Sequence, residues 1–161
     1  MRLLYCCIAF ALMFTSECSA ATRAYVMYGG IVGAGLAKIA ASLRARGDIV
    51  EYGSYTQAAE FGADACAHTR DRIVVIGHSF GGTAAVEVAT KASTCGARNV
   101  TMISIDPASS GAVQGPARAV NFVGEYGNSI AGARNIPVPG FTHMGILENP
   151  AFQARVLSAA Q

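Results

Sequence analysis

One short glycine-rich stretch contains a side chain that could do covalent chemistry. Ser79 lies in "GHSFG", residues 77–81, with a glycine two positions before it and another two positions after it. Four branched aliphatic residues precede the stretch at 73–76, and an alanine-rich segment follows it. These features favour a sharp turn between a buried strand and a helix, since glycine tolerates backbone contacts too close for a Cβ atom. Such a turn would lift the serine hydroxyl out of a sheet as a candidate nucleophile.

A serine hydroxyl needs a general base, which is usually a histidine. The sequence contains three histidines. His78 adjoins the serine, and its side chain should point away from Ser79. His68 precedes the strand predicted over 72–77, so we expect it at the amino-terminal edge of the sheet, in solvent. His143 follows the last predicted strand and can return over the carboxyl edge, so we predict that His143 is the base.

The third group should be a carboxylate that fixes the imidazole tautomer and stabilises its protonated form. Asp106 ends a predicted strand in "MISIDPASSG", where Pro107 forces the chain to turn. Glu125 is its rival, near the end of the next predicted strand in "NFVGEYGN". We favour Asp106, because an aspartate held before a proline is better positioned than a glutamate flanked by glycines. Glu125 stays open as the alternative.

Acyl transfer also needs hydrogen-bond donors for a developing oxyanion. One donor should be the backbone N–H of Phe80, at the positive end of the following helix. The second should come from the turn "YGGIVGAG" after the first predicted strand, at Gly30 or Ile31. These glycines do not match Gly-x-Gly-x-x-Gly, and the sequence contains no Gly-x-x-x-x-Gly-Lys-[Ser/Thr] segment. Both observations disfavour a nucleotide-binding protein.

The apolar pattern predicts the elements that must position these residues. Short β-branched runs alternate with longer amphipathic segments, which indicates a mostly parallel sheet of five to six strands with helices on both faces, the α/β class. In such sheets ligands lie beyond the carboxyl ends of the strands. Ser79, Asp106 and His143 should meet there. The expected strands are 24–28, 48–52, 72–77, 98–106, 118–126 and 133–138, and the expected helices are 34–46, 55–69, 80–94 and 149–160.

The first 20 residues have the features of a secretory signal peptide. Arg2 precedes an apolar run of about a dozen residues, and small residues follow it at 19–21. The run is shorter than the roughly 20 residues that span a bilayer. Cleavage near Ala20 or Ala21 would leave one domain over 21–161, secreted or periplasmic, with no stable membrane span.

The cysteine content and the net charge favour a disulfide and disfavour a metal site and a nucleic-acid partner. Only Cys66 and Cys95, of five cysteines, lie beyond the expected signal peptide. A pair in an exported domain indicates one disulfide, here between the helices flanking the strand at 72–77, and two free thiols are the alternative. Two cysteines without Cys-x-x-Cys disfavour a metal site. A net charge of +2 without a Lys/Arg cluster disfavours a nucleic-acid partner.

The order serine, acid, histidine in "GHSFG", Asp106 and His143 resembles the α/β-hydrolase superfamily over essentially all of 21–161. The "IDPA" segment at 105–108 is similar to the acid segment of pancreatic-lipase-like members. Many other members place the acid one strand later, which keeps Glu125 open. The resemblance implies hydrolysis of an ester, thioester or amide through an acyl-serine, without metal or cofactor.

The chain is short for this fold, which implies a minimal version without a lid. We therefore expect an open, shallow cleft and a small-molecule or lipid-like ester substrate with a short acyl group, cleaved without interfacial activation. The alternative is a non-catalytic binding module built on a trimmed form of the same fold.

Overall fold

The computed structural model describes residues 20–30 and 33–161. The expected signal peptide at 1–20 therefore lies almost wholly outside the described residues, and so does Ile31. Among the helices of the described part, none is long and apolar enough to cross a membrane.

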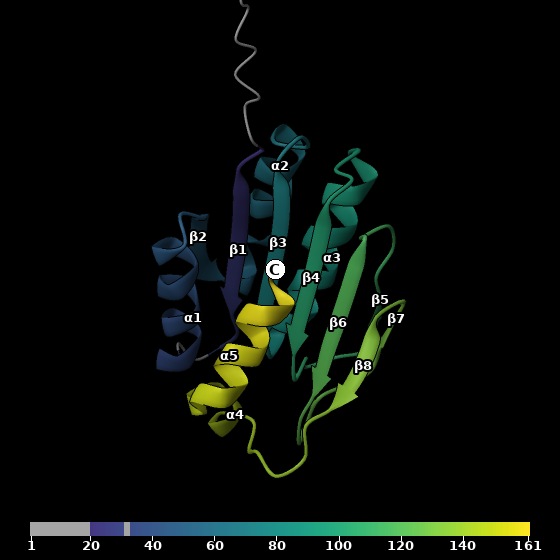
Figure 1. The fold of residues 1–161 in the computed structure, drawn as a ribbon. Helices are drawn as coiled ribbons and strands as arrows, with labels where there is room; N and C mark the ends of the chain where they lie inside the picture. Colours follow the sequence, from purple (N-terminus) through teal and green to yellow (C-terminus); the bar gives the residue numbers. More distant parts are fainter. Residues whose placement is uncertain (1–19, 31–32) are drawn as a thin grey trace, which may run out of the picture.

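Six strands form the central sheet, in the order β2–β1–β3–β4–β6–β8 (Figure 1). All of its recorded strand pairings are parallel, so the carboxyl ends of the strands share one edge. A smaller parallel sheet pairs two-residue strands, β5 and β7. The bounds are β1 Thr22–Tyr28, β2 Ile49–Ser54, β3 Arg72–His78, β4 Val100–Ile105, β5 Gly111–Ala112, β6 Arg118–Val123, β7 Ile130–Ala131 and β8 Arg134–Pro137.

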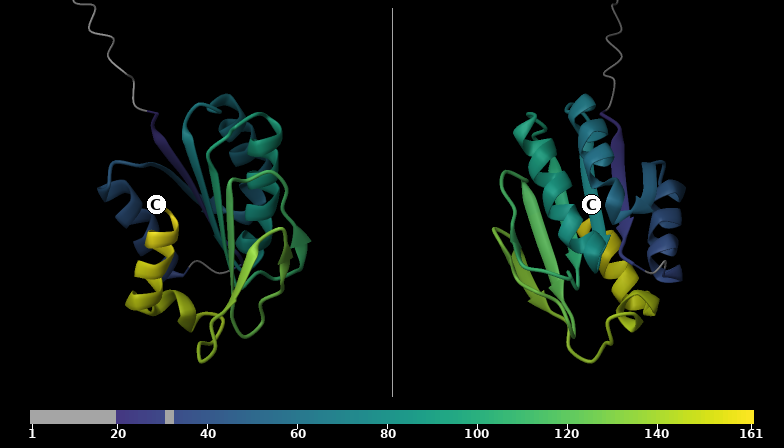
Figure 2. Two further views of the ribbon diagram at one scale, coloured as in Figure 1. Left: turned by 45° about the vertical axis from the view of Figure 1, so that its right-hand side comes forward. Right: turned by 180° about the vertical axis from the view of Figure 1, so that it is seen from behind.

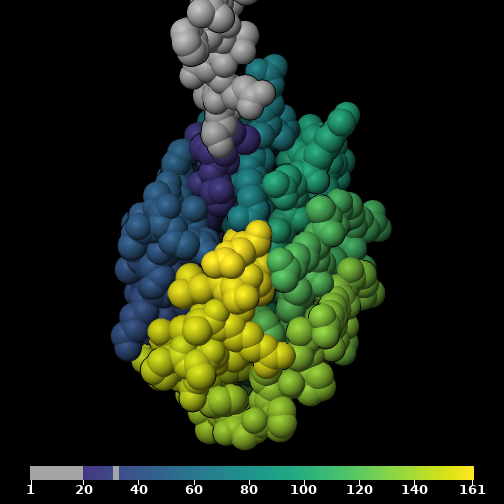
Figure 3. Space-filling model, viewed as in Figure 1, coloured from purple at the N-terminus to yellow at the C-terminus, as the bar shows by residue number. Residues whose placement is uncertain are grey.

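Helices cover both faces of the sheet, which gives three layers (Figure 2). On one face lie α1, α4 and α5, and on the other lie α2 and α3 (Figure 1). In the space-filling view, α5 covers the middle of the sheet between α1 and the strands β6 and β8 (Figure 3). The bounds are α1 Ala34–Ala45, α2 Ala58–Ala67, α3 Phe80–Thr94, α4 Gly145–Glu148 and α5 Pro150–Ala159.

Alternation along β3 divides the core between the two faces. Val74 and Ile76 pack in the cluster that includes α1 and α5, whereas Ile73 and Val75 pack in the cluster that includes α2 and α3. All four side chains are buried, as expected for a central parallel strand covered on both sides. By the same period of two, His78 at the end of β3 faces the α1–α4–α5 layer.

The predicted fold class is confirmed, and the differences are local. The helix expected over 55–69 begins instead with a 3₁₀ turn, Tyr55–Gln57, because Ser54 and Gln57 form a capping box that tightens the chain there. The strands expected over 98–106 and 118–126 end earlier, at Ile105 and Val123. The elements β5, β7 and α4 were not expected, because two to four residues show no usable periodicity.

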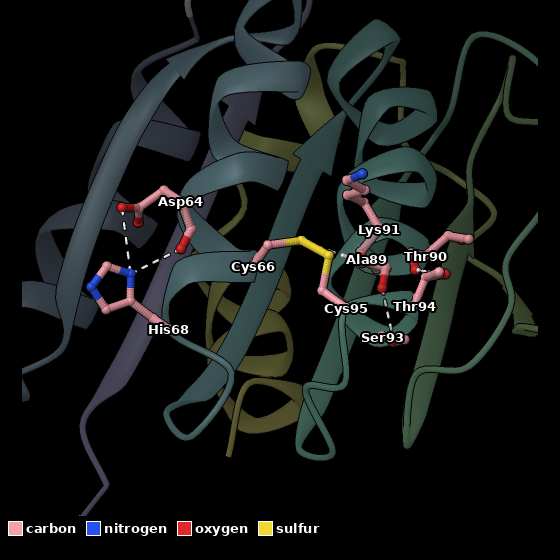
Figure 4. Close-up of a disulfide and its surroundings, with 9 residues drawn as sticks. All are labelled: Asp64, Cys66, His68, Ala89, Thr90, Lys91, Ser93, Thr94 and Cys95. Atoms are coloured by element: carbon pink, nitrogen blue, oxygen red, sulfur yellow. Dashed lines mark hydrogen bonds and ion pairs between the residues drawn. A yellow bond between two sulfur atoms is a disulfide. The ribbon is translucent and has the colours of Figure 1, made fainter.

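A disulfide joins Cys66 of α2 to Cys95 at the end of α3 (Figure 4). This is the predicted pair, and it links the two helices that flank β3 on one face. His68 lies close by at the end of α2, where its Nδ1 is 2.8 Å from the Asp64 carbonyl oxygen. The disulfide and His68 therefore lie away from the carboxyl edge of the sheet.

Removing the disulfide should lower stability. The bond spans a sequence separation of 29 residues, for which chain entropy gives about 3.6 kcal/mol of stabilisation. We expect Cys66→Ser/Cys95→Ser to lose roughly this free energy of unfolding in urea titrations. Wild-type protein under reducing conditions should match the double variant, and the variant should not respond to reductant. Equal stability of oxidised and reduced wild type would contradict this account.

Candidate active site

The turn between β3 and α3 holds Ser79 in a strained conformation. Its φ is 60° and its ψ is −125°. In the described chain only two non-glycine residues have positive φ, Ser79 and Asp106, the latter at 46°. Such backbones cost about 1–3 kcal/mol each and cluster at functional sites. The flanking glycines permit the turn, because a Cβ on Gly77 would collide with the carbonyl oxygen of Gly81.

Backbone hydrogen bonds fix this turn against its neighbours. The Ser79 N–H donates to the Ile105 carbonyl oxygen at 3.0 Å, and the Ser79 carbonyl oxygen accepts from the N–H of Thr83 and of Ala108, both at 3.2 Å. The ends of β3 and β4 and the first turn of α3 thus form one unit. Ser79 lines a cavity of about 180 Å³, together with Gly29, Gly30, His78, Phe80, His143 and Met144.

Asp106 and His143 form the shortest polar contact near this cavity. His143 Nδ1 lies 2.5 Å from Asp106 Oδ2, and the Gly124 N–H donates to Asp106 Oδ1 at 2.9 Å. Asp106 is fully buried. Gly127 must be glycine here, because a Cβ would collide with Oδ1 of the same carboxyl group. With Nδ1 held by Asp106, Nε2 is the imidazole nitrogen left to serve the cavity that His143 shares with Ser79.

Glu125, the rival acid, lies elsewhere. It is exposed, and it lines a second cavity of about 350 Å³ with the chain from Val138 to Thr142. Its neighbour Gly124 reaches Asp106, but through its backbone N–H. The structure therefore places the carboxyl group of Asp106, and not that of Glu125, against the imidazole.

The expected oxyanion-hole residues Phe80 and Gly30 lie beside Ser79 along the same cavity. Phe80 is the first residue of α3, and the first N–H groups of a helix have no partner within the helix. An ideal Cβ on Gly29 would lie 3.1 Å from the Phe80 nitrogen and 2.9 Å from Ser79 Cβ. Gly30 lines the cavity beside them. Ile31, the other expected donor, lies outside the described residues.

Sequence reasoning missed a contact of His78. We expected only that its side chain would point away from Ser79, and the structure adds that it meets His143. His78 Nε2 lies 2.9 Å from the His143 carbonyl oxygen, and the ring centroids are 4.5 Å apart. A carbonyl oxygen only accepts hydrogen bonds, so Nε2 carries the proton and donates. The alternation of β3 could have predicted the face of the sheet on which His78 lies, but not its partner.

The pKa of His78 is lowered to about 4, mainly by burial and to a smaller extent by positive charge at His143. The hydrogen bond to the His143 backbone and the negative charge of Asp106 act in the opposite direction and are weaker. His78 is therefore neutral at neutral pH.

The arrangement suits proton transfer between a hydroxyl and an imidazole supported by a carboxyl group. Within the described residues, no hydrogen bond joins Ser79 Oγ to His143, although both line the cavity. Catalytic hydrogen bonds are often long without substrate and tighten when it binds. No cluster of three or more His, Cys, Asp or Glu side chains that could hold a metal ion occurs in the part of the chain that the structure describes.

The neutral His78 should make stability depend on pH. Its folded-state pKa, about 4, is below the ordinary value of 6.5, so the unfolded chain binds the proton first. The stabilisation is complete above pH 6.5 and is lost as pH falls through 4, by up to about 1.4 kcal/mol per pH unit. Wild type should therefore lose stability relative to His78→Gln over this window in urea titrations. A difference that is constant from pH 7 to 4.5 would refute the assignment.

Comparison with known proteins and protein families identifies the family to which this chain belongs. A search of curated proteins returned no match. The model of the alpha/beta hydrolase family matches residues 22–160, which include every strand of the sheet, the strained turn at Ser79 and the loop of His143. The chain belongs to the alpha/beta hydrolase family.

Proposed function

We propose that this protein is a serine hydrolase that cleaves carboxylic esters, or thioesters, through an acyl-serine intermediate. The observation that carries the proposal is the Asp106–His143 contact at 2.5 Å, on the rim of a cavity that also contains Ser79 at a strained turn. Family membership supports hydrolysis in general. The assignment of the nucleophile, base and acid rests on this geometry.

The reaction proceeds in two halves. Ser79 Oγ attacks the acyl carbon while its proton moves to His143 Nε2, and Asp106 stabilises the imidazolium that forms. The negative oxygen of the tetrahedral intermediate accepts from the Phe80 N–H and from the glycine turn at Gly30. The imidazolium then gives its proton to the leaving oxygen or sulfur. A water molecule, activated by His143, next attacks the acyl-serine and releases the acid.

The cavity favours a small apolar acyl group. Its volume of about 180 Å³ is below the range of roughly 300–1,000 Å³ found for drug-sized ligands. Phe80 and Met144 line it and remain 53% and 39% exposed. The Phe80 ring stacks on Tyr55 at a centroid distance of 5.3 Å, so this apolar wall is held in place. A short acyl ester, free in solution or presented by a lipid-like molecule, fits this site without interfacial activation.

The proposed location is secreted or periplasmic. The Cys66–Cys95 disulfide supports it, because structural disulfides persist in oxidising compartments. The amino-terminal pattern at 1–20 is the other support.

A fluorophosphonate probe tests the nucleophile directly. We expect it to label the wild-type protein, because it phosphonylates an activated serine, and Ser79→Ala to abolish both labelling and ester hydrolysis. Ser129→Ala, which changes an exposed serine, is the matched control and should behave as wild type. Folded wild-type protein that resists the probe and hydrolyses no ester would support the alternative, a non-catalytic binding module.

Two isosteric changes separate the candidate acids. Asp106→Asn should reduce kcat by about 10³- to 10⁴-fold, because the amide holds the wrong tautomer of His143 and cannot stabilise the imidazolium. Glu125→Gln should leave kcat unchanged, since Glu125 points to solvent. Steady-state kinetics on p-nitrophenyl acetate make the comparison. A large loss in Glu125→Gln with little loss in Asp106→Asn would reverse the assignment.

A further inference from the structure

The loop that carries His143 has few attachments. It connects β8 to α4, and Pro139, Gly140, Thr142 and Met144 are exposed along it. Its ends are bound, since the Val138 N–H donates to the Val123 carbonyl oxygen at 2.9 Å and the Ile146 N–H donates to the Thr142 carbonyl oxygen at 3.1 Å. Between these ends Phe141 packs against Phe152 of α5, with ring centroids 6.4 Å apart, and His143 makes contacts of its own.

The contacts of His143 act on different parts of the residue, and they include an edge contact between its ring and that of Tyr126, with centroids 6.0 Å apart. Asp106 binds ring nitrogen Nδ1, which sets the tautomer of the imidazole. His78 donates from Nε2 to the backbone carbonyl oxygen of His143 at 2.9 Å, and the two rings pack at 4.5 Å. The Asp106 contact therefore acts on the ring, whereas the hydrogen bond from His78 acts on the backbone from which the ring extends.

His78 is a rigid point from which to hold this backbone. It is 2% exposed, it is the last residue of β3, and it pairs with Ile105 in the register of β3 and β4. Ser79 follows it directly, and the Ser79 N–H is bound to the carbonyl oxygen of that same Ile105. The nucleophile and the anchor of the loop thus belong to one strand end, so the anchor fixes His143 relative to Ser79.

We propose that His78 is a positioning residue, which holds the backbone of His143 so that its imidazole reaches the Ser79 hydroxyl. This inference rests on the proposed function. It assigns a role to the variable position before the serine in "GHSFG", at which the chemistry itself demands no particular side chain.

The charge state of His78 agrees with this role. The ionisable groups that face it are His143, from the β8–α4 loop, and Asp106, from the end of β4. Because burial holds the pKa of His78 near 4, it stays neutral while His143 gains a proton during attack. A neutral ring can pack against an imidazolium, whereas a second positive charge would oppose its formation.

Two amide substitutions provide a matched test. In His78→Gln the side-chain nitrogen occupies about the position of Nε2 and can still donate to the His143 carbonyl oxygen. In His78→Asn the amide is one methylene shorter and cannot reach it. Both variants place a neutral amide in the same buried space, so their difference reports the hydrogen bond more than burial. Thermal unfolding of each variant sets the assay temperature well below its transition.

We expect His78→Asn to lower kcat on p-nitrophenyl acetate by about 10- to 100-fold, the size of effect that a displacement of about 1 Å produces. KM should change little, and the rate of fluorophosphonate labelling should fall in parallel with kcat. His78→Gln should recover most of both rates. A purely structural role would lower the unfolding temperature without separating the two folded variants in kcat.

The outcomes distinguish this inference from the proposed function. Wild-type protein that neither reacts with the probe nor hydrolyses the ester overturns the proposed function, and this inference with it. Active wild-type protein with His78→Asn equally active, or with the two amides equally impaired, overturns the role of His78 and leaves the serine hydrolase intact.

Discussion

The buried carboxyl group of Asp106 is the constraint on which the site depends. A polar group with no exposed surface costs free energy unless it is hydrogen-bonded, and both oxygens of Asp106 are bound, one by His143 and one by the Gly124 N–H. Satisfying this group requires the loop after β6 to pass over it and the loop after β8 to return to it. The carboxyl group therefore binds two loops, from distant parts of the sequence, at the end of β4.

Strain is concentrated where these segments meet. Ser79 and Asp106 directly follow adjacent strands, β3 and β4, and both have positive φ. At each one the chain leaves the sheet abruptly, so the side chain rises at the strand end instead of continuing the alternation. Strain of this kind persists because the surroundings over-determine it. The hydrogen bonds of the Ser79 backbone to Ile105, Thr83 and Ala108 are the local part of those surroundings.

The two faces of the sheet contribute differently. The α2–α3 face carries the disulfide, and α3 brings the N–H groups of its first turn to Ser79. The α1–α4–α5 face carries the loop that returns His143, and His78 points toward this face because it continues the alternation of Val74 and Ile76. The candidate site thus lies where the two layers meet at the carboxyl edge. Helix α3 forms one wall of the candidate site. The β8–α4 loop, which is bound to the end of β3 through His78, forms the other wall.

Periodicity and turn residues predicted the α/β class and a mostly parallel sheet with helices on both faces, and the number of cysteines indicated a Cys66–Cys95 disulfide. These follow from contacts between residues near in sequence, or from composition, and the structure agrees with them. The strand-to-helix turn at Ser79 could also be predicted from neighbouring residues, because the spacing of the glycines around the serine indicates such a turn. The sequence favoured Asp106 over Glu125 because of Pro107, but it left both open as the acid, since both lie near the ends of predicted strands. The tertiary structure adds that Asp106, and not Glu125, contacts the imidazole of His143, because Gly127 leaves space for the Asp106 carboxyl group whereas Glu125 is exposed. The contact of His78 with the His143 backbone likewise needed the folded loop, because it joins residues 65 positions apart, and no local pattern specifies where a loop of that kind returns.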